Sequence, residues 1–265
     1  MSVTSAMFTG VSGLLANAEG INVIGNNLAN VNTIGFKYGR MLFSDMLSSN
    51  IGNNSQIGRG TQIQKVDNIF GQGSFESTEL VTDLAIQGDT FFALGKPDVT
   101  AAVAVTDAYY TRAGAFRLIP DATTPANLYL CNPDGYRLLD SARVPIMFTA
   151  ATFDKITQIG ADGTIKYLNN TGALTTYASK IGTAAITDKG AMTKEGGTLY
   201  KSSSATVAAP NGTTEKVFSN SLEQSNVDMA AQFVKMILTQ RAYSANSKTI
   251  TTADEMTQEV LNLKR

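Results

Sequence analysis

Hydrophobic residues recur at helical spacing near both ends of the chain. The N-terminal set is separated by steps of four, three, four, three and seven residues, which places it on one helix face: Met7, Val11, Leu14, Ala18, Ile21 and Leu28. The C-terminal set has similar spacing, with a small phase shift before its last member: Met229, Phe233, Met236, Tyr243, Ile250 and Val260. We expect the first helix to end near Asn30, before a turn-rich segment that leads to Gly35, a candidate for a positive φ that reverses the chain. The second has no Pro or Gly from residue 226 to 265 and is predicted to be about 40 residues long, near 60 Å.

Between these helices the hydrophobic pattern is typical of β-structure. Residues Gly60–Val66 alternate between apolar and polar, which predicts a strand, and from residue 83 onward short apolar runs are separated by turn residues. The fold class is therefore α+β, with long terminal helices that form a coiled coil and a mostly-β domain inserted between them. We expect residues 1–35 and 225–265 to form the helical coil, residues 36–82 an extended linking segment with short strands, and residues 83–224 a β-rich outer domain.

The predicted helix pair leaves two interpretations open. Both helices could pack on one ordinary core, or they could form a coil whose core is completed by neighbouring copies of the chain. A coil of two helices buries one stripe of each, so apolar residues at other positions stay available to partners: Phe8, Leu15, Val23 and Leu238. The length of the helices and their place at the chain ends favour the second interpretation.

Composition argues against several classes of function. The chain of 265 residues has 21 Lys and Arg against 22 Asp and Glu, whereas nucleic-acid binders usually have a basic excess. It has no His and a single Cys, Cys131, so the commonest metal ligands and general base are missing. We predict no catalytic, cofactor or metal site, and no membrane-inserted helix, since no run of about 18 apolar residues occurs. Charged residues make up only 16% of the chain, so copies repel one another weakly and association is favoured.

Five segments resemble parts of a known family. The N-terminal segment Gly25–Lys37 and the C-terminal segments Ser225–Met229 and Gln240–Lys248 resemble the two terminal signatures of the axial proteins of the bacterial flagellum, which form its rod and hook. Segments Asp83–Phe92 and Tyr110–Phe116 resemble the opening of the β domain in this family. The motif residues carried over are Asn26, Asn27, Asn30, Asn32, Gly35, Phe36 and Asn226.

The resemblance implies a structural subunit with no active site. Such subunits form a homo-oligomeric helical tube that transmits motor torque and encloses the export channel. Its partners would be neighbouring rod, hook-cap and hook–filament junction proteins and the flagellar type III export apparatus. Segments Met7–Leu14, Phe43–Leu47 and Gln72–Thr78 look most like the hook protein, which predicts an extracellular hook subunit lacking the outer domain. The total length fits the distal rod better, so a distal or proximal rod subunit of the periplasmic basal body is the alternative.

A different class of protein also stays open. A secreted β-rich adhesin or enzyme with helical ends would have the same coarse pattern. An adhesin would bind a surface as a monomer, and an enzyme lacking His would have to use carboxylates, Ser or Lys. Electron microscopy distinguishes them, because only a tube subunit assembles into filaments of fixed diameter.

Overall fold

The computed structural model describes residues 3–52, 55–121, 124–202 and 204–263, which divide into two compact units. The first, here called the helical unit, comprises Met1–Val31, Tyr38–Ile69 and Val227–Arg265. The second, called the β unit, comprises Asn32–Lys37 and Phe70–Asn226. The chain therefore passes from one unit to the other at four points. The α+β class is confirmed, with a helix at each end and a mostly-β region between them.

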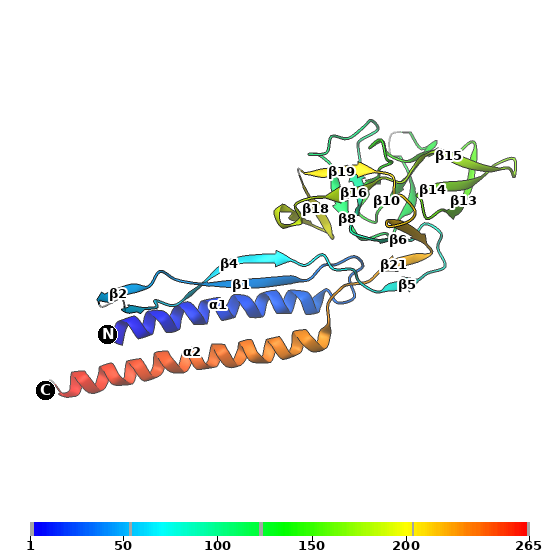
Figure 1. The fold of residues 1–265 in the computed structure, drawn as a ribbon. Coiled ribbons are helices and arrows are strands. Elements are labelled where there is room, and N and C mark those ends of the chain that lie inside the picture. Colours follow the sequence, from blue (N-terminus) through cyan, green and yellow to red (C-terminus); the bar gives the residue numbers. More distant parts are fainter. Residues whose placement is uncertain (1–2, 53–54, 122–123, 203, 264–265) are drawn as a thin grey trace. The chain divides into compact units, whose positions relative to one another are not determined.

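The helical unit contains two long helices and a β-ribbon. Its elements are α1 (Val3–Ala29), β1 (Gly39–Asp45), β2 (Ser49–Gly52), β3 (Ser55–Ile57), β4 (Thr61–Asn68) and α2 (Met229–Leu263). Strands β1 and β4 pair antiparallel, from Gly39 opposite Asn68 to Asp45 opposite Thr61, and β2 pairs with β3. Figure 1 shows α1 between the β1–β4 ribbon and α2. Strands β1 and β4, which lie in the predicted linking segment 36–82, thus form a ribbon that packs on α1.

Helices α1 and α2 run antiparallel and approach closely through glycine. A Cβ atom added to Gly10 would lie 2.9 Å from Cγ1 of Ile250, and one added to Gly13 would lie 2.7 Å from Nδ2 of Asn246. Residues later in α1 therefore face residues earlier in α2, as in any antiparallel pair. A larger residue at either glycine would require the facing side chain on α2 to move, so glycine at these positions allows the two helices to approach closely.

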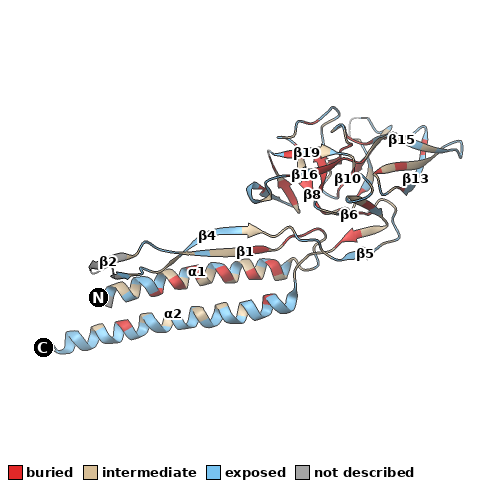
Figure 2. Cartoon of the chain, viewed as in Figure 1, coloured by how far each residue is buried: buried red, intermediate tan, exposed pale blue. Residues whose placement is uncertain are grey.

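The buried face of α1 lies one residue away from the face expected from the sequence. Its buried positions, coloured red in Figure 2, are Gly10, Gly13, Ala16, Gly20, Ile24 and Asn27. The expected stripe residues Met7, Leu14, Ala18, Ile21 and Leu28 are only half-buried, and Val11 is exposed. The physical reason is that glycine carries no hydrophobic side chain, and yet it lines the face that permits the closest helix contact. The apolar stripe therefore flanks the buried face.

The β unit is built from short strands joined by turns. They are β5 (Phe75–Ser77), β6 (Leu84–Gln87), β7 (Phe91–Gly95), β8 (Tyr109–Thr111), β9 (Arg117–Pro120), β10 (Asn127–Cys131), β11 (Arg137–Leu138), β12 (Met147–Thr149), β13 (Phe153–Ile159), β14 (Thr164–Asn169), β15 (Leu174–Lys180), β16 (Thr183–Ile186), β17 (Thr193–Gly196), β18 (Leu199–Lys201), β19 (Ala205–Ala208), β20 (Lys216–Ser219) and β21 (Ser221–Glu223), with a 3-10 helix at Lys189–Ala191. The largest sheet follows the order β12-β10-β11-β7-β8-β18-β17. In addition, β9 pairs with β10, β16 pairs with β7, and β19 pairs with β16. Strands β13, β14 and β15 form a separate sheet, and β20 pairs with β6 and β21 with β5.

The core of the β unit lies on both faces of β7. Every residue of this strand is buried, as expected for a central strand with a continuous apolar run. Phe92 packs on one side with Phe116, ring centroids 5.2 Å apart, and Phe91 packs on the other with Phe70 at 5.4 Å. These two hydrophobic clusters join β7 to β6 and β8. The residues that follow β6 and β8 belong to the polar cluster described next. Among the described residues, no helix is long and apolar enough to cross a membrane.

Candidate functional site

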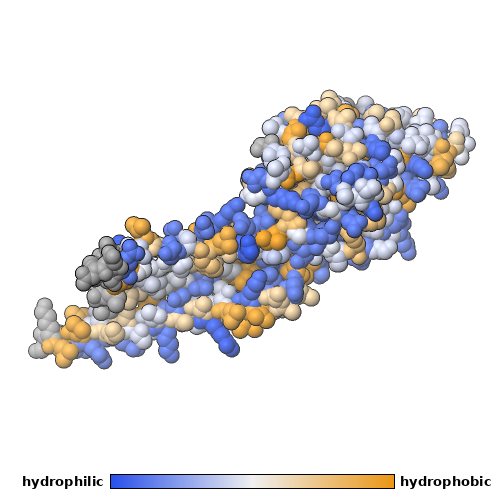
Figure 3. All heavy atoms as spheres, in the orientation of Figure 1, coloured by the Kyte–Doolittle hydropathy of each residue, from blue (hydrophilic) through white to orange (hydrophobic). Residues whose placement is uncertain are grey.

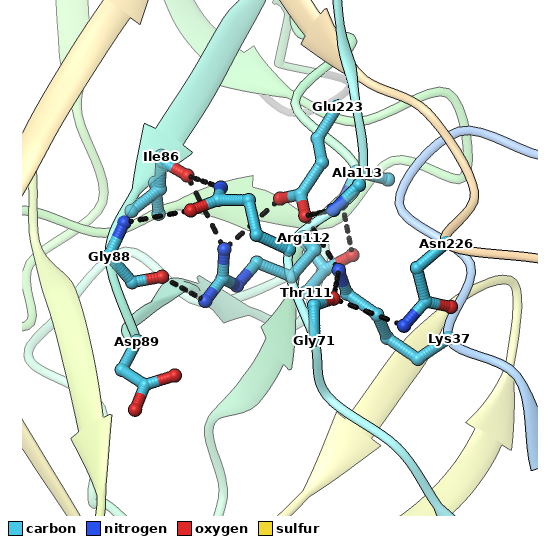
Figure 4. A network of polar contacts seen from close by, with 12 residues as sticks. Lys37, Gly71, Ile86, Gly88, Asp89, Thr111, Arg112, Ala113, Glu223 and Asn226 are labelled. Carbon is cyan, nitrogen blue, oxygen red and sulfur yellow. Dashed lines mark hydrogen bonds and ion pairs between the residues drawn. The ribbon is translucent and has the colours of Figure 1, made fainter.

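The carboxylate of Glu223, at the end of β21, is fully buried and is the centre of a cluster of hydrogen bonds in the β unit. Its Oε1 accepts hydrogen bonds from Nζ of Lys37 at 2.6 Å and from the backbone N–H of Gly73 at 2.9 Å. Its Oε2 accepts one from Nη1 of Arg112 at 3.1 Å. The side chains of Lys37, Arg112 and Glu223 are at most 1% exposed, and Figure 4 shows them converging. We call these three residues the ion cluster.

Arg112 joins the ion cluster to the turn after β6. Its guanidinium donates to the carbonyl oxygen of Ile86 at 3.3 Å and to that of Gly88 at 2.6 Å, and it lies 5.0 Å from the centroid of the Phe91 ring. Gln72 holds the same turn, donating to the Ile86 carbonyl at 2.6 Å and accepting from the Gly88 N–H at 3.2 Å. The cluster is thus embedded in backbone hydrogen bonds.

The ion cluster contains two cations and one carboxylate. Burial lowers the pKa of the Lys37 ammonium from its ordinary value, and the neighbouring Glu223 carboxylate opposes this shift. Lys37 also donates to the carbonyl oxygen of Gly71 at 2.6 Å. A buried charge is tolerated only when it is paired and hydrogen-bonded, so both cations depend on Glu223.

Three motif residues named from the sequence surround the ion cluster. The N–H of Gly35 donates to the backbone carbonyl of Glu223 at 2.8 Å, and the N–H of Asn226 donates to that of Phe36 at 3.4 Å. The Asn226 side chain donates to Gly71 at 3.1 Å. Gly35 has φ of +68°, and a Cβ atom there would lie 2.3 Å from the backbone nitrogen of Ala113, so only glycine fits.

The asparagines of the N-terminal motif segment lie elsewhere. Asn27 is buried in the helical unit, where its amide exchanges two hydrogen bonds of 2.8 Å with the backbone of Gly39 and donates to Oε1 of Gln232 at 3.4 Å. It therefore joins α1, β1 and α2. Asn30 donates to the Asn26 carbonyl at the end of α1, and Asn32 is exposed. The motif is thus divided between two structural roles.

Large hydrophobic side chains are exposed along both helices. Phe8 is 70% exposed and Leu15 63% on α1, and Leu238 is 59% exposed on α2, while Val23 is half-buried. Of the predicted α2 stripe, Met236 and Ile250 are half-buried, whereas four members are exposed: Met229, Phe233, Tyr243 and Val260. Figure 3 shows hydrophobic residues on the surface of this unit. That the predicted stripe residues contact other subunits remains a prediction.

Among the described residues, no group of three or more Cys, Asp and Glu side chains is placed to hold a metal ion. Cys131 is a buried free thiol, and burial raises its pKa to about 11. It is thus protonated and shielded at neutral pH.

Comparison with known proteins gives end-to-end matches. Residues 7–37 match the family described as flagella basal body rod protein, residues 85–167 the flagellar hook protein FlgE/F/G D1 domain, and residues 219–263 the flagellar basal body rod FlgEFG protein C-terminal family. The flagellar basal-body rod protein FlgG of Bacillus subtilis is 36% identical over 98% of this chain and 99% of its own length. FlgG of Caulobacter vibrioides is 32% identical over 98% of this chain and 99% of its own length.

These matches define an axial protein of the bacterial flagellum. The chain belongs to the flagellar rod and hook protein family, which includes FlgG and FlgE. The flagellar hook protein FlgE of Borreliella burgdorferi is 39% identical, but over only 46% of this chain and 29% of its own length. The findings thus support the rod alternative better than the hook subunit expected from local motifs.

The ion cluster was not found from the sequence. Lys37 and Arg112 both lie inside segments that resemble the family, and each has an apolar neighbour in the sequence. A charged residue in such a position was the only indication in the sequence that these side chains could be buried. Glu223 lies 186 residues after Lys37, and their pairing depends on the fold. Gln232 was missed because a polar residue on a long helix is usually exposed.

Proposed function

We propose that this chain is a structural subunit of the flagellar rod that polymerises into a helical tube and has no catalytic role. The observation that carries the proposal is its end-to-end similarity to rod proteins of nearly equal length. Its partners would be further copies of itself and adjoining axial proteins, with delivery by the flagellar type III export apparatus. Its place would be the periplasmic basal body.

The exposed hydrophobic faces of the helical unit support polymerisation. Phe8 and Leu15 lie on α1, whereas Phe233 and Leu238 lie on α2, so the two exposed faces are different surfaces of the chain. When different surfaces of identical subunits meet, the contact is head-to-tail and generates a ring or an open helix. We propose that the α1 face of one copy contacts the α2 face of the next, with Met7, Val11 and Leu14 at the margin.

We further propose that α1 and α2 form a coiled coil within the tube. Their antiparallel pairing through Gly10 and Gly13 supports this proposal, as does the half-burial of Met236 and Ile250. Burial of the flanking apolar residues by neighbouring copies would complete its core. The helical unit would then form an inner layer, and the β unit an outer one.

The test introduces a charge into the proposed contact. Leu238→Asp should leave the isolated subunit folded, with its free energy of unfolding changed by less than about 1 kcal/mol, because this side chain is exposed. It should abolish filaments in electron micrographs, because burying an unpaired carboxylate costs several kcal/mol. Gln240→Asp places the same charge at an exposed polar position on α2 and should assemble normally.

Two outcomes decide against the proposal. Normal filaments from Leu238→Asp would exclude this face from the contact. Wild-type filaments that are curved, or antibody labelling outside the cell, would identify a hook subunit, which the 39% local identity to FlgE favours. Straight filaments and periplasmic labelling are expected for the rod.

A further inference from the structure

Three segments that connect the two units meet at the ion cluster of the β unit. They are residues 32–37, residues 71–74 and residues 223–226, here called the connecting segments. The first supplies Lys37, the second Gly71 and Gly73, and the third Glu223 and Asn226. Each lies next to a point where the chain leaves the β unit. The cluster therefore gathers segments that are far apart in the sequence.

We propose that the ion cluster is a charge-dependent lock that fastens the connecting segments to the β unit. Glu223 is its central residue, because its carboxylate accepts hydrogen bonds from the side chains of Lys37 and Arg112 and from the backbone N–H of Gly73. Neutralising this carboxylate releases the connecting segments while the two hydrophobic clusters around β7 stay folded. The lock is thus a conformational device separate from the core.

Glu223 is required because, among the described residues, no other carboxylate contacts Lys37 or Arg112. Without its charge, Lys37 and Arg112 keep only neutral carbonyl partners in a buried site. The Nε of Arg112 is buried and has no hydrogen-bond partner within the described chain, so this guanidinium is already incompletely satisfied. The nearby Asp89 cannot substitute, since its side chain is 84% exposed and pairs with Lys189 at 2.8 Å. The cations would regain hydration only if the segments opened.

The hydrophobic clusters have a different physical basis. Phe92 and Phe116 pack among apolar side chains, so their packing does not depend on the charge of Glu223. Their strands are also held by the ladder between β7 and β8. Local opening at the connecting segments can therefore cost less free energy than unfolding of the whole unit. This difference makes the lock measurable.

The lock gives the rod subunit a means of setting stiffness, and this consequence rests on the proposed function. Connecting segments fastened at one buried cluster have little freedom to move relative to the β unit. Once released, they become flexible joints in every subunit of the tube. Filaments with open locks should therefore bend more easily than filaments of the wild-type chain.

Hydrogen exchange of the isolated full chain, followed by mass spectrometry, tests the lock. In Glu223→Gln, amides of the connecting segments should exchange about 100-fold faster or more, because removal of one partner leaves buried charges unpaired. Peptides covering β7 and β8 should keep their wild-type rates. Asp89→Asn is the matched control, since it removes a neighbouring carboxylate that is exposed, and it should leave all rates unchanged.

A double variant removes one of the two cations that Glu223→Gln leaves without a carboxylate. Lys37→Met combined with Glu223→Gln leaves Arg112 as the one cation of the cluster, so it should recover part of the lost protection. Equal acceleration in the connecting segments and in β7 would overturn the proposal, as would unchanged rates in Glu223→Gln or a double variant as exposed as the single one.

The wild-type chain provides a second measurement if Glu223→Gln does not fold. Its connecting segments should exchange with one common rate that is faster than that of β7 and β8, and exchange only together with those strands would refute a separate lock. The mechanical consequence is measured as filament persistence length, which should fall in Glu223→Gln; an unchanged length would limit the lock to the isolated subunit. Failure of the wild-type chain to form filaments would contradict the proposed function and leave the exchange result intact.

Discussion

Replacing Gly35 by alanine should destabilise the β unit far more than the same change at a comparable turn. An L-residue at φ of +68° costs roughly 1–2 kcal/mol relative to glycine. The new Cβ atom would also lie 2.3 Å from the nitrogen of Ala113 and 2.6 Å from the carbonyl carbon of Arg112, and both are backbone atoms that cannot rotate away. Overpacking of this kind costs about 1–3 kcal/mol more. The expected loss is therefore about 2–5 kcal/mol.

Two glycine substitutions serve as controls. Gly172 has φ of +79° in a turn with no atom within 4 Å of an added Cβ, so Gly172→Ala incurs only the backbone cost of about 1–2 kcal/mol. Gly25 lies inside α1, also with open space around it and without a positive φ, so Gly25→Ala should stabilise the chain by about 0.5–1 kcal/mol.

Urea unfolding followed by far-UV circular dichroism measures the free energy of unfolding of each variant. Thermal unfolding gives a parallel estimate, at about 2–4 °C per kcal/mol for a domain of this size. If Gly35→Ala and Gly172→Ala lose the same free energy, contact with the Ala113 backbone contributes nothing and the reasoning fails.

Two further predictions concern buried titratable groups. Burial raises the pKa of Tyr110 to about 12, so the folded state holds this proton more tightly than the unfolded state; its stabilising contribution is present below about pH 10 and is lost as the pH rises toward 12. Tyrosinate absorbance should show a late ionisation step that accompanies unfolding and decreases in Tyr110→Phe; ionisation of this tyrosine together with exposed ones would contradict the prediction. Cys131 should react with a thiol reagent only at the rate of unfolding, because it is 3% exposed and its pKa is raised to about 11; rapid labelling of the folded chain would show that the thiol is accessible.

The helices and the β class were predictable because their signals are local. Strand Thr61–Asn68 and helix Val3–Ala29 lie close to the segments predicted from periodicity and turn residues. The buried face of α1 could not be located from the hydrophobic pattern, because Gly10 and Gly13 have no hydrophobic side chain and yet lie on that face. Small residues at a helix contact are recognised only when the partner helix is known.

The candidate site was less accessible from the sequence. Gly35 was named as a position that reverses the chain, and its positive φ confirms that prediction. The interaction of Lys37 with Glu223 could not be derived, because a charged residue is usually exposed and its buried partner is distant in sequence. The choice between rod and hook likewise depended on the whole chain, since local motifs resemble both.

The pairing of Lys37 with Glu223 also has a consequence for the order in which the chain folds. The contact spans 186 residues, so the entropy of closing a very long loop opposes it until the strands between have formed and brought its ends together. Contacts of such large sequence separation slow folding. A chain that emerges N-terminus first can build β7 and its neighbours early, but Lys37 has no carboxylate partner until β21 has appeared. We therefore expect the ion cluster to be the last part of the β unit to form, and a chain that is still being synthesised lacks this closing contact.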